Sequence, residues 1–137
     1  MSELVAVQDC TFTYETTPSG SVSLVTTVVP PSSKVLAKGN RAHTDKITIN
    51  VLSGSVNLDT LPANVENPGV VPTGTIQIDA TAQKADSLGK PFVLKGDEGS
   101  ASFSCTFPMT VSPYSTEISV TIKATVDDTN QDVLKVT

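Results

Sequence analysis

The feature that most constrains how this chain can fold is the alternation of apolar and polar residues at every second position. In the stretch 118–125, isoleucine, valine and alanine alternate with serine, threonine and lysine, and 22–26, 47–50 and 76–79 show the same period. Successive side chains of a strand point to opposite faces, so this pattern predicts half-buried β-strands. Shorter strand candidates are 10–14, 35–37, 92–94, 101–107 and 133–136.

The composition favours the same fold class. Valine, isoleucine and threonine make up about a third of the chain, and these β-branched residues favour strands. Nine prolines and eight glycines are spread along 137 residues, which leaves no room for long helices. Residues 58–73 contain three prolines and predict a long surface loop. We therefore expect a single all-β domain, 1–137, of roughly ten short strands joined by turns.

The charge balance argues against a nucleic-acid partner. Nine basic and fourteen acidic residues give a net charge of −5, and the aromatic residues are four Phe and two Tyr. Neither a phosphate-tracking surface nor a stacking platform for bases is therefore expected. Residues 1–7 contain no basic and apolar signal region, so we expect cytoplasmic synthesis without a signal peptide. The apolar run 22–29 is too short to cross a bilayer.

An internal repeat is visible when the sequence is overlaid on itself at an offset of fifty residues. Lys34 then matches Lys84, and Gly39 matches Gly89. A strong strand candidate precedes each copy, and the strand candidate at 117–126 leads into a third, shorter copy. The repeat predicts units near 21–52, 74–107 and 117–137. The alternative is that such echoes arise in any β protein of many short strands.

These residues carry a resemblance to a known family. Residues 82–97, which end in Gly-Lys-Pro-Phe-Val-Leu-Lys-Gly-Asp, resemble the S-x-x-V-x-x-x-G-x-P-x-x-x-x-G-D units of PAAR and PAAR-like proteins, and 33–42 resembles them less closely. Those proteins are compact, pseudo-threefold cones of short strands that cap the central spike of contractile injection systems and phage tails. The resemblance implies that fold here, over about half of the chain. It marks seven residues as holding the repeat turns, namely Lys34, Gly39, Lys84, Gly89, Pro91, Gly96 and Asp97.

The resemblance also implies a function. The chain would be a structural, non-enzymatic spike tip that sharpens the spike for membrane piercing and is assembled into an injection particle or virion. Its partners would be a trimeric, VgrG-like spike protein, the membrane of a target cell in transient contact, and effector proteins carried on 58–73. Three similar units can contact three identical subunits at once, which gives the repetition a mechanical reason.

No cofactor is expected from this resemblance. PAAR tips commonly hold a metal through three histidines and one cysteine, whereas this chain has a single histidine. The family's metal site therefore does not carry over to this sequence.

Two other functions fit the residues. Threonine- and serine-rich strands spaced about ten residues apart also fit an Ig-like β-sandwich, as in a virion decoration protein or a tail-tube subunit. The third possibility is a small zinc or iron protein, or an enzyme, built around Cys10, His43 and Cys105.

The single histidine and the two cysteines each have several interpretations. His43 lies in a polar turn before a strand, so we expect it to be exposed or to cap the turn, with a metal ligand or a catalytic base as alternatives. Cys10 and Cys105 share the context Cys-Thr-Phe. If their strands pair, the two thiols and His43 supply three ligands of a tetrahedral metal site. The alternatives are two buried small hydrophobic residues or a disulfide.

Overall fold

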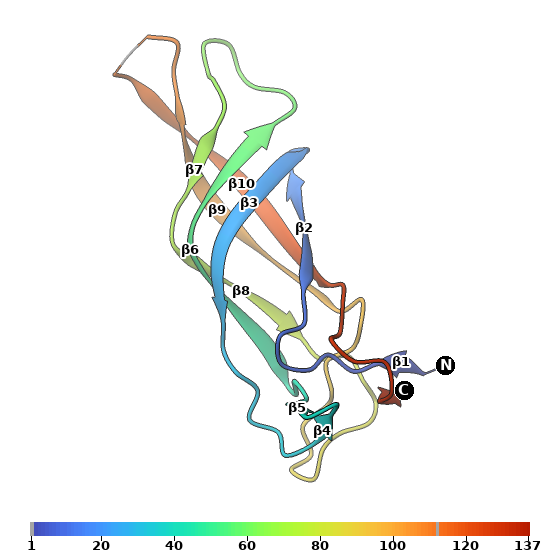
Figure 1. Ribbon diagram of the computed structural model, residues 1–137. Helices are drawn as coiled ribbons and strands as arrows, with labels where there is room; N and C mark the ends of the chain where they lie inside the picture. The colour runs from blue at the N-terminus through green and yellow to red at the C-terminus, as the bar shows by residue number, and fades with distance from the viewer. Residues whose placement is uncertain (1, 112) are drawn as a thin grey trace.

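Strands, turns and loops form the whole of the described chain, residues 2–111 and 113–137 of the computed structural model, and this part contains no helix (Figure 1). The strands are β1 (Glu3–Leu4), β2 (Phe12–Thr17), β3 (Gly20–Val28), β4 (Leu36–Ala37), β5 (Asn40–Arg41), β6 (Lys46–Leu58), β7 (Gly69–Val71), β8 (Gly74–Asp79), β9 (Glu98–Pro108), β10 (Ser115–Val126) and β11 (Lys135–Val136). The expected all-β class is confirmed. Across the described residues, no helix long and apolar enough to span a membrane is found.

One antiparallel sheet holds seven of the strands, in the order β2-β10-β9-β7-β6-β3 with β8 paired to β6. The long strand β6 pairs with β3 along one edge, and with β7 and β8 in succession along the other. A register shift between Val25 and Thr26 of β3 and the natural strand twist bend the sheet, which curls into a half-barrel (Figure 1). Six of these strands follow one path and β8 pairs only with β6, so all seven belong to one sheet, whereas the Ig-like alternative requires two packed sheets.

The inside of the half-barrel is the main hydrophobic core. Every second residue of β6, β8, β9 and β10 points into it over the central part of each strand. Its fully buried large side chains include Ile47, Ile49, Ile76, Ile78, Phe107 and Ile122. Gly69 and Gly74 lie against the rings of Phe107 and Phe103, and an added Cβ would come within 2.4 and 2.5 Å of those rings. These glycines let β7 and β8 approach β9 closely.

A second, smaller core lies at the end of the half-barrel where the two chain termini meet (Figure 1). There β1 pairs with β11, and β4 pairs with β5. The buried residues of this cluster are Val5, Val7, Ala37, Ala42, Phe92 and Leu94. We call this part of the molecule the ring end, and it comprises residues 2–11, 30–46, 80–97 and 127–137.

Three segments, 5–7, 42–44 and 92–94, are joined at the ring end by a closed ring of backbone hydrogen bonds. The middle residue of each segment donates its N–H to the carbonyl of the middle residue of another segment. The bonds are Ala6 N to Val93 O (2.9 Å), Val93 N to His43 O (3.0 Å) and His43 N to Ala6 O (2.9 Å). Antiparallel bridges join the end residues in the same cyclic order, Val7 to Ala42, Thr44 to Phe92, and Leu94 to Val5. The bonding pattern thus occurs three times.

The chain on either side of each ring segment repeats as well. The first ring residue donates to a preceding hairpin arm, in the bonds Ala42 N to Val35 O (2.9 Å), Phe92 N to Lys84 O (3.2 Å) and Val5 N to Leu134 O (3.0 Å). Shortly after the segment one residue takes a positive φ, namely Asp9 (68°), Asp45 (69°) and Gly96 (89°). The next strands are then β2, β6 and β9. Each ring segment with its hairpin arms forms one corner of the ring end.

Two corners are closed by turns, and the third contains the chain ends. A turn at Lys38 and Gly39 joins β4 to β5, and residues 86–90 join the bridged residues Ala85 and Pro91. In the third corner the arms are β11 and β1, so the two termini lie where the other corners have a turn (Figure 1).

The sequence overlay at an offset of fifty aligns equivalent residues of the ring segments, but it misaligns the hairpin arms that precede them by one residue. Ala42 and Phe92, which the overlay aligns, both begin a ring segment. The bonding partner equivalent to Lys84 is however Val35 rather than Lys34, because the second turn is longer than the first. An overlay at a constant offset cannot show that one copy contains an extra residue.

The expected third unit, 117–137, contains no ring segment. Its corner is completed by 5–7, from the opposite end of the chain. The sequence overlay could not indicate this, because a repeat interrupted by the termini has no constant offset.

The expected surface loop at 58–73 is too long. β6 continues through Leu58, and β7 pairs with it, so the loop spans 59–68. Gly69 and Val71 are buried although they lie between prolines. The edge of β6 supplies the pairing that the local sequence does not predict.

The equivalence of the three corners predicts that the termini can be moved. Joining Thr137 to Ser2 through Asn-Gly, and opening the chain between Lys38 and Gly39, should give a folded protein. Its free energy of unfolding should lie within about 2 kcal/mol of the parent, because one exposed turn replaces another. Urea unfolding followed by circular dichroism measures this, and a permutant opened between Asn50 and Val51 inside β6 is the control that should not fold. Failure of the first permutant to fold would contradict the equivalence.

Candidate functional site

The seven residues expected to hold the repeat turns all lie at the ring end, in two of its three corners. Gly39, Gly89 and Gly96 have φ angles of +80°, +80° and +89°, and no atom lies within 4 Å of a Cβ built on any of them. The backbone conformation, not crowding, therefore makes glycine suitable at these positions. The lysines Lys34 and Lys84 are exposed.

Pro91 and Asp97 have specific bonding roles in the corner of ring segment 92–94. The Pro91 carbonyl accepts a hydrogen bond from Asp45 N (2.7 Å), which links two corners. The Asp97 carboxylate, only 8% exposed, accepts bonds from Leu94 N (2.8 Å), from Thr81 N (3.2 Å) and from the Thr81 hydroxyl. This carboxylate fixes the end of ring segment 92–94 to the start of the loop that leads into it.

Replacing Asp97 should destabilise the protein strongly. Asp97→Ala leaves the buried Leu94 N–H without its partner, and we expect a loss of about 3 kcal/mol in the free energy of unfolding, measured by urea denaturation. Asp86 is the matched control, because it also accepts two backbone bonds, from Leu88 N and Lys90 N, but these are exposed to solvent. Asp86→Ala should cost less than about 1 kcal/mol. Equal losses in the two variants would contradict the role given to Asp97.

The third corner has a polar anchor that the sequence did not indicate. The Gln131 side chain is 6% exposed and makes four hydrogen bonds. Its Nε2 donates to Val5 O (2.7 Å) and Leu134 O (2.9 Å), and its Oε1 accepts from Val133 N and Leu134 N. Gln131 therefore joins ring segment 5–7 to the arm that precedes it. It lies in a polar run that reads as an ordinary solvated turn, so no sequence signal distinguishes it.

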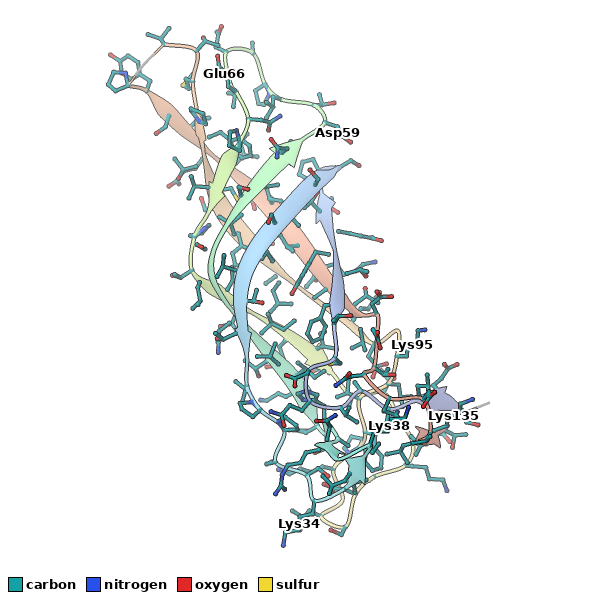
Figure 2. All side chains as sticks on the ribbon, viewed as in Figure 1. Lys34, Lys38, Asp59, Glu66, Lys95 and Lys135 are labelled. Carbon is teal, nitrogen blue, oxygen red and sulfur yellow. The ribbon has the colours of Figure 1, made fainter. Side chains whose placement is uncertain are left out.

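Basic side chains gather at the ring end. Eight of the nine lysine and arginine residues lie there, and the ninth, Lys123 on β10, lies 3.3 Å from Glu15 and 3.5 Å from Glu98. Figure 2 shows Lys34, Lys38, Lys95 and Lys135 at this end, and Asp59 and Glu66 at the opposite end. Eight acidic residues balance the ring end, so the net charge of −5 falls on the rest of the molecule.

His43 is buried, which corrects the expectation that it is exposed or caps a turn. It is the middle residue of ring segment 42–44 and is 3% exposed, and the other middle residues, Ala6 and Val93, belong to the main core. Burial lowers the pKa of the imidazole to about 4, so the ring is neutral at pH 7. No hydrogen bond to this side chain is found within the described residues.

A pocket of about 350 Å³ adjoins the imidazole. Its walls come from the start of β2, the end of β3 and the ring, namely Gln8, Asp9, Cys10, Val28, Val29, Pro30, Pro31 and His43. Burial raises the pKa of the Cys10 thiol to about 12, so the thiol is protonated at neutral pH. Nucleophilic cysteine chemistry uses a thiolate, and the surroundings of Cys10 disfavour one. Among the residues that line the pocket, Asp9 is the acidic one, and none is basic at pH 7.

The two cysteines and His43 do not form one site, because Cys10 and His43 line the same pocket and Cys105 does not. Cys105 is fully buried on β9, and β10 lies between β9 and β2, so the two Cys-Thr-Phe segments do not pair and the condition for a shared metal site is not met. Both thiols are free. Across residues 2–111 and 113–137, no group of three or more His, Cys, Asp or Glu side chains is placed to hold a metal ion.

The buried imidazole predicts a pH dependence of stability. The pKa of His43 is lower in the folded state than the usual 6.5 of the unfolded chain, so the unfolded chain binds the proton more tightly. Above pH 6.5 His43 is neutral in both states and costs no stability. As the pH falls from 6.5 towards 4, the unfolded chain takes up the proton first and the free energy of unfolding decreases. The loss should reach about 3 kcal/mol.

His43→Val tests this dependence, because valine occupies the equivalent ring position at Val93. Urea unfolding at pH 7, 6, 5 and 4 should show a steeper loss for the parent than for the variant. Carboxylates titrate in both proteins and cancel in the difference. Parallel pH profiles would contradict the buried neutral imidazole.

Comparisons of the chain with protein-family models, with curated proteins and with solved structures find no match.

Proposed function

We propose that this protein is a structural tip that caps the end of a threefold-symmetric spike in a contractile injection system or phage-like tail, as its PAAR-like turn sequences suggest. The observation that carries this proposal is the ring of backbone hydrogen bonds, whose pattern occurs three times at one end of the molecule. A single chain with three similar corners can contact three identical subunits at once. The role is mechanical and non-enzymatic.

The ring end is the end that docks on the spike in this proposal. Its three corners repeat, whereas the connections at the far end differ in length, from the tight turn between β2 and β3 to the loop between β6 and β7. Lys38 is paired with Asp132 (2.7 Å), but Lys90 and Lys135 are exposed and make no ion pair in the described residues, and these two lysines suit an acidic spike end.

The far end then points outward, towards the target cell. Val111 and Tyr114, in the connection between β9 and β10, are 62% and 65% exposed, and exposed apolar side chains suit a transient membrane contact. The loop 59–68 at the same end is the position proposed for effector cargo (Figure 1). Antiparallel strands run between the two ends, so a force along the molecule is shared among many backbone hydrogen bonds.

Stoichiometry tests the proposal. Co-expression with the trimeric spike protein encoded in the same operon, followed by native mass spectrometry, should give one copy of this chain per spike trimer. A three-to-three complex, or rings of this chain alone, would overturn the proposal in favour of a tube or decoration subunit.

Charge reversal tests which end docks. Lys90→Glu or Lys135→Glu should weaken the complex about tenfold, because each removes a cation at one corner. Asp59→Lys or Glu66→Lys at the far end is the matched control and should leave the affinity unchanged. If only the far-end variants weaken the complex, the docking surface lies at the far end and the proposed orientation is contradicted.

A further inference from the structure

The half-barrel is not closed between β2 and β3. These strands are the two edges of the seven-stranded sheet, and a tight turn connects them, but no strand ladder joins them in the described chain. Figure 1 shows them diverging from that turn towards the ring end. We call the gap between them the seam.

The seam is a departure from the threefold pattern. The strands that follow the ring segments are β2, β6 and β9, and each is connected to a returning strand. β6 pairs with its returning strands β7 and β8, and β9 pairs with β10 along almost its whole length. Only the pairing of β2 with its returning strand β3 is missing among these three described connections.

The free edge of β3 is suited to pairing with another strand. Its nine residues contain no charged residue and no proline, and Val25 is 58% exposed. Natural edge strands are usually protected by lysine, proline or short length, because their unpaired N–H and C=O groups bind further strands. β3 has none of these protections.

Apolar side chains along the seam are only half covered. Phe12 and Tyr14 of β2, and Val22, Leu24 and Val28 of β3, pack against the main core but are partly exposed. A hydrogen bond between the side chains of Tyr14 and Thr26 bridges the gap. Beside it, the hydroxyl of Thr16 is buried without a hydrogen-bond partner. Side chains therefore bridge the seam at one point, and one buried hydroxyl group near it has no hydrogen-bond partner.

The pocket at His43 lies at the wide end of the seam. Its walls include Cys10, just before β2, and Val28, the last residue of β3. The buried neutral imidazole of His43 has a free acceptor nitrogen, and Asp9 in the wall has no ion-pair partner in the described residues. At the narrow end, Asp59 lines a second hollow with Tyr14 and Gly20. An occupant with a positive side chain at its pocket end complements this charge.

We propose that the seam binds an extended segment of a partner protein, which pairs antiparallel with the free edge of β3 and places a lysine or arginine in the pocket formed by Asp9 and His43. β3 runs from the narrow end of the seam to the pocket, so the N-terminal end of an antiparallel segment lies at the pocket. Alternate apolar side chains of the segment cover the half-exposed residues of both edges. This is strand addition, with backbone bonds giving affinity and the pocket giving specificity. The inference does not depend on the proposed spike role.

A synthetic peptide tests the proposal. The probe is acetylated Lys-Thr-Val-Ser-Val-Thr-Val-Ser-Thr with a fluorescent label at its C-terminus, titrated with the full chain and followed by fluorescence anisotropy. We expect saturable binding, at least tenfold weaker when the lysine is replaced by glutamate, and lost when the same residues are scrambled so that the valines are adjacent. Absence of saturable binding, or equal binding of the scrambled peptide, overturns the proposal.

Variants of the protein locate the binding site. Asp9→Asn should weaken binding of the lysine peptide about tenfold without straining the backbone, because asparagine tolerates the positive φ of this position. Ser23→Lys on the β3 edge should abolish binding, whereas Thr121→Lys is the matched control and should not, because Thr121 of β10 is paired on both sides, with Thr17 of β2 and Ser102 of β9. Equal effects of the two lysine variants would place the peptide elsewhere.

A second copy of this chain is the competing occupant. Sedimentation equilibrium distinguishes it: we expect a monomer for both the parent and Ser23→Lys. A dimer of the parent that Ser23→Lys dissociates would assign the β3 edge to self-association and overturn the proposal.

Discussion

The hydrogen bonds among Ala6, His43 and Val93 constrain the rest of the structure, because each of these residues uses its N–H on one neighbour and its C=O on the other. A buried backbone group without a partner costs about 1–3 kcal/mol, so removing any one segment leaves groups on both others unpaired. The three segments can therefore be satisfied only together. β2, β6 and β9 begin within a few residues of the ring, so the ring also fixes where these three strands enter the half-barrel.

Two departures from the repetition occur on the same side of the molecule. His43 occupies a ring position at which the other corners have alanine and valine, and it contacts the pocket at the wide end of the seam. The seam is the one connection, within the described chain, at which a strand following the ring does not pair with its return. If three equivalent corners were the only requirement, an apolar residue at position 43 and a sheet closed between β2 and β3 would be favoured. Their coincidence supports the proposal that the seam and the pocket act as one binding surface.

The strands of the half-barrel were predictable because their alternation extends over many residues. β8 and β10 show a period of two in the sequence, and their buried residues follow it. The turn glycines were also visible, because glycine is the residue that takes a positive φ without strain. Asp9 and Asp45 adopt the same conformation in the other corners and gave no such signal.

The ring was beyond sequence reasoning. Its segments are three residues long, which is too short to show a period, and the bond between Ala6 and Val93 joins distant parts of the chain. The misplacement of His43 has the same origin. Its polar neighbours Arg41 and Thr44 indicate an exposed turn, whereas its actual environment is set by two remote segments.

The third corner, where β1 meets β11, sets a condition on when the fold can be completed. The N–H of Val5 binds the carbonyl of Leu134, and Gln131 holds both strands of this corner. Bringing such distant residues together costs chain entropy before any contact repays it, which slows folding. During synthesis, segment 5–7 is made before the other two ring segments, yet its corner cannot close until residues 131–136 have left the ribosome. This corner therefore closes only after the strands between its two halves have been made, although those strands can pair earlier.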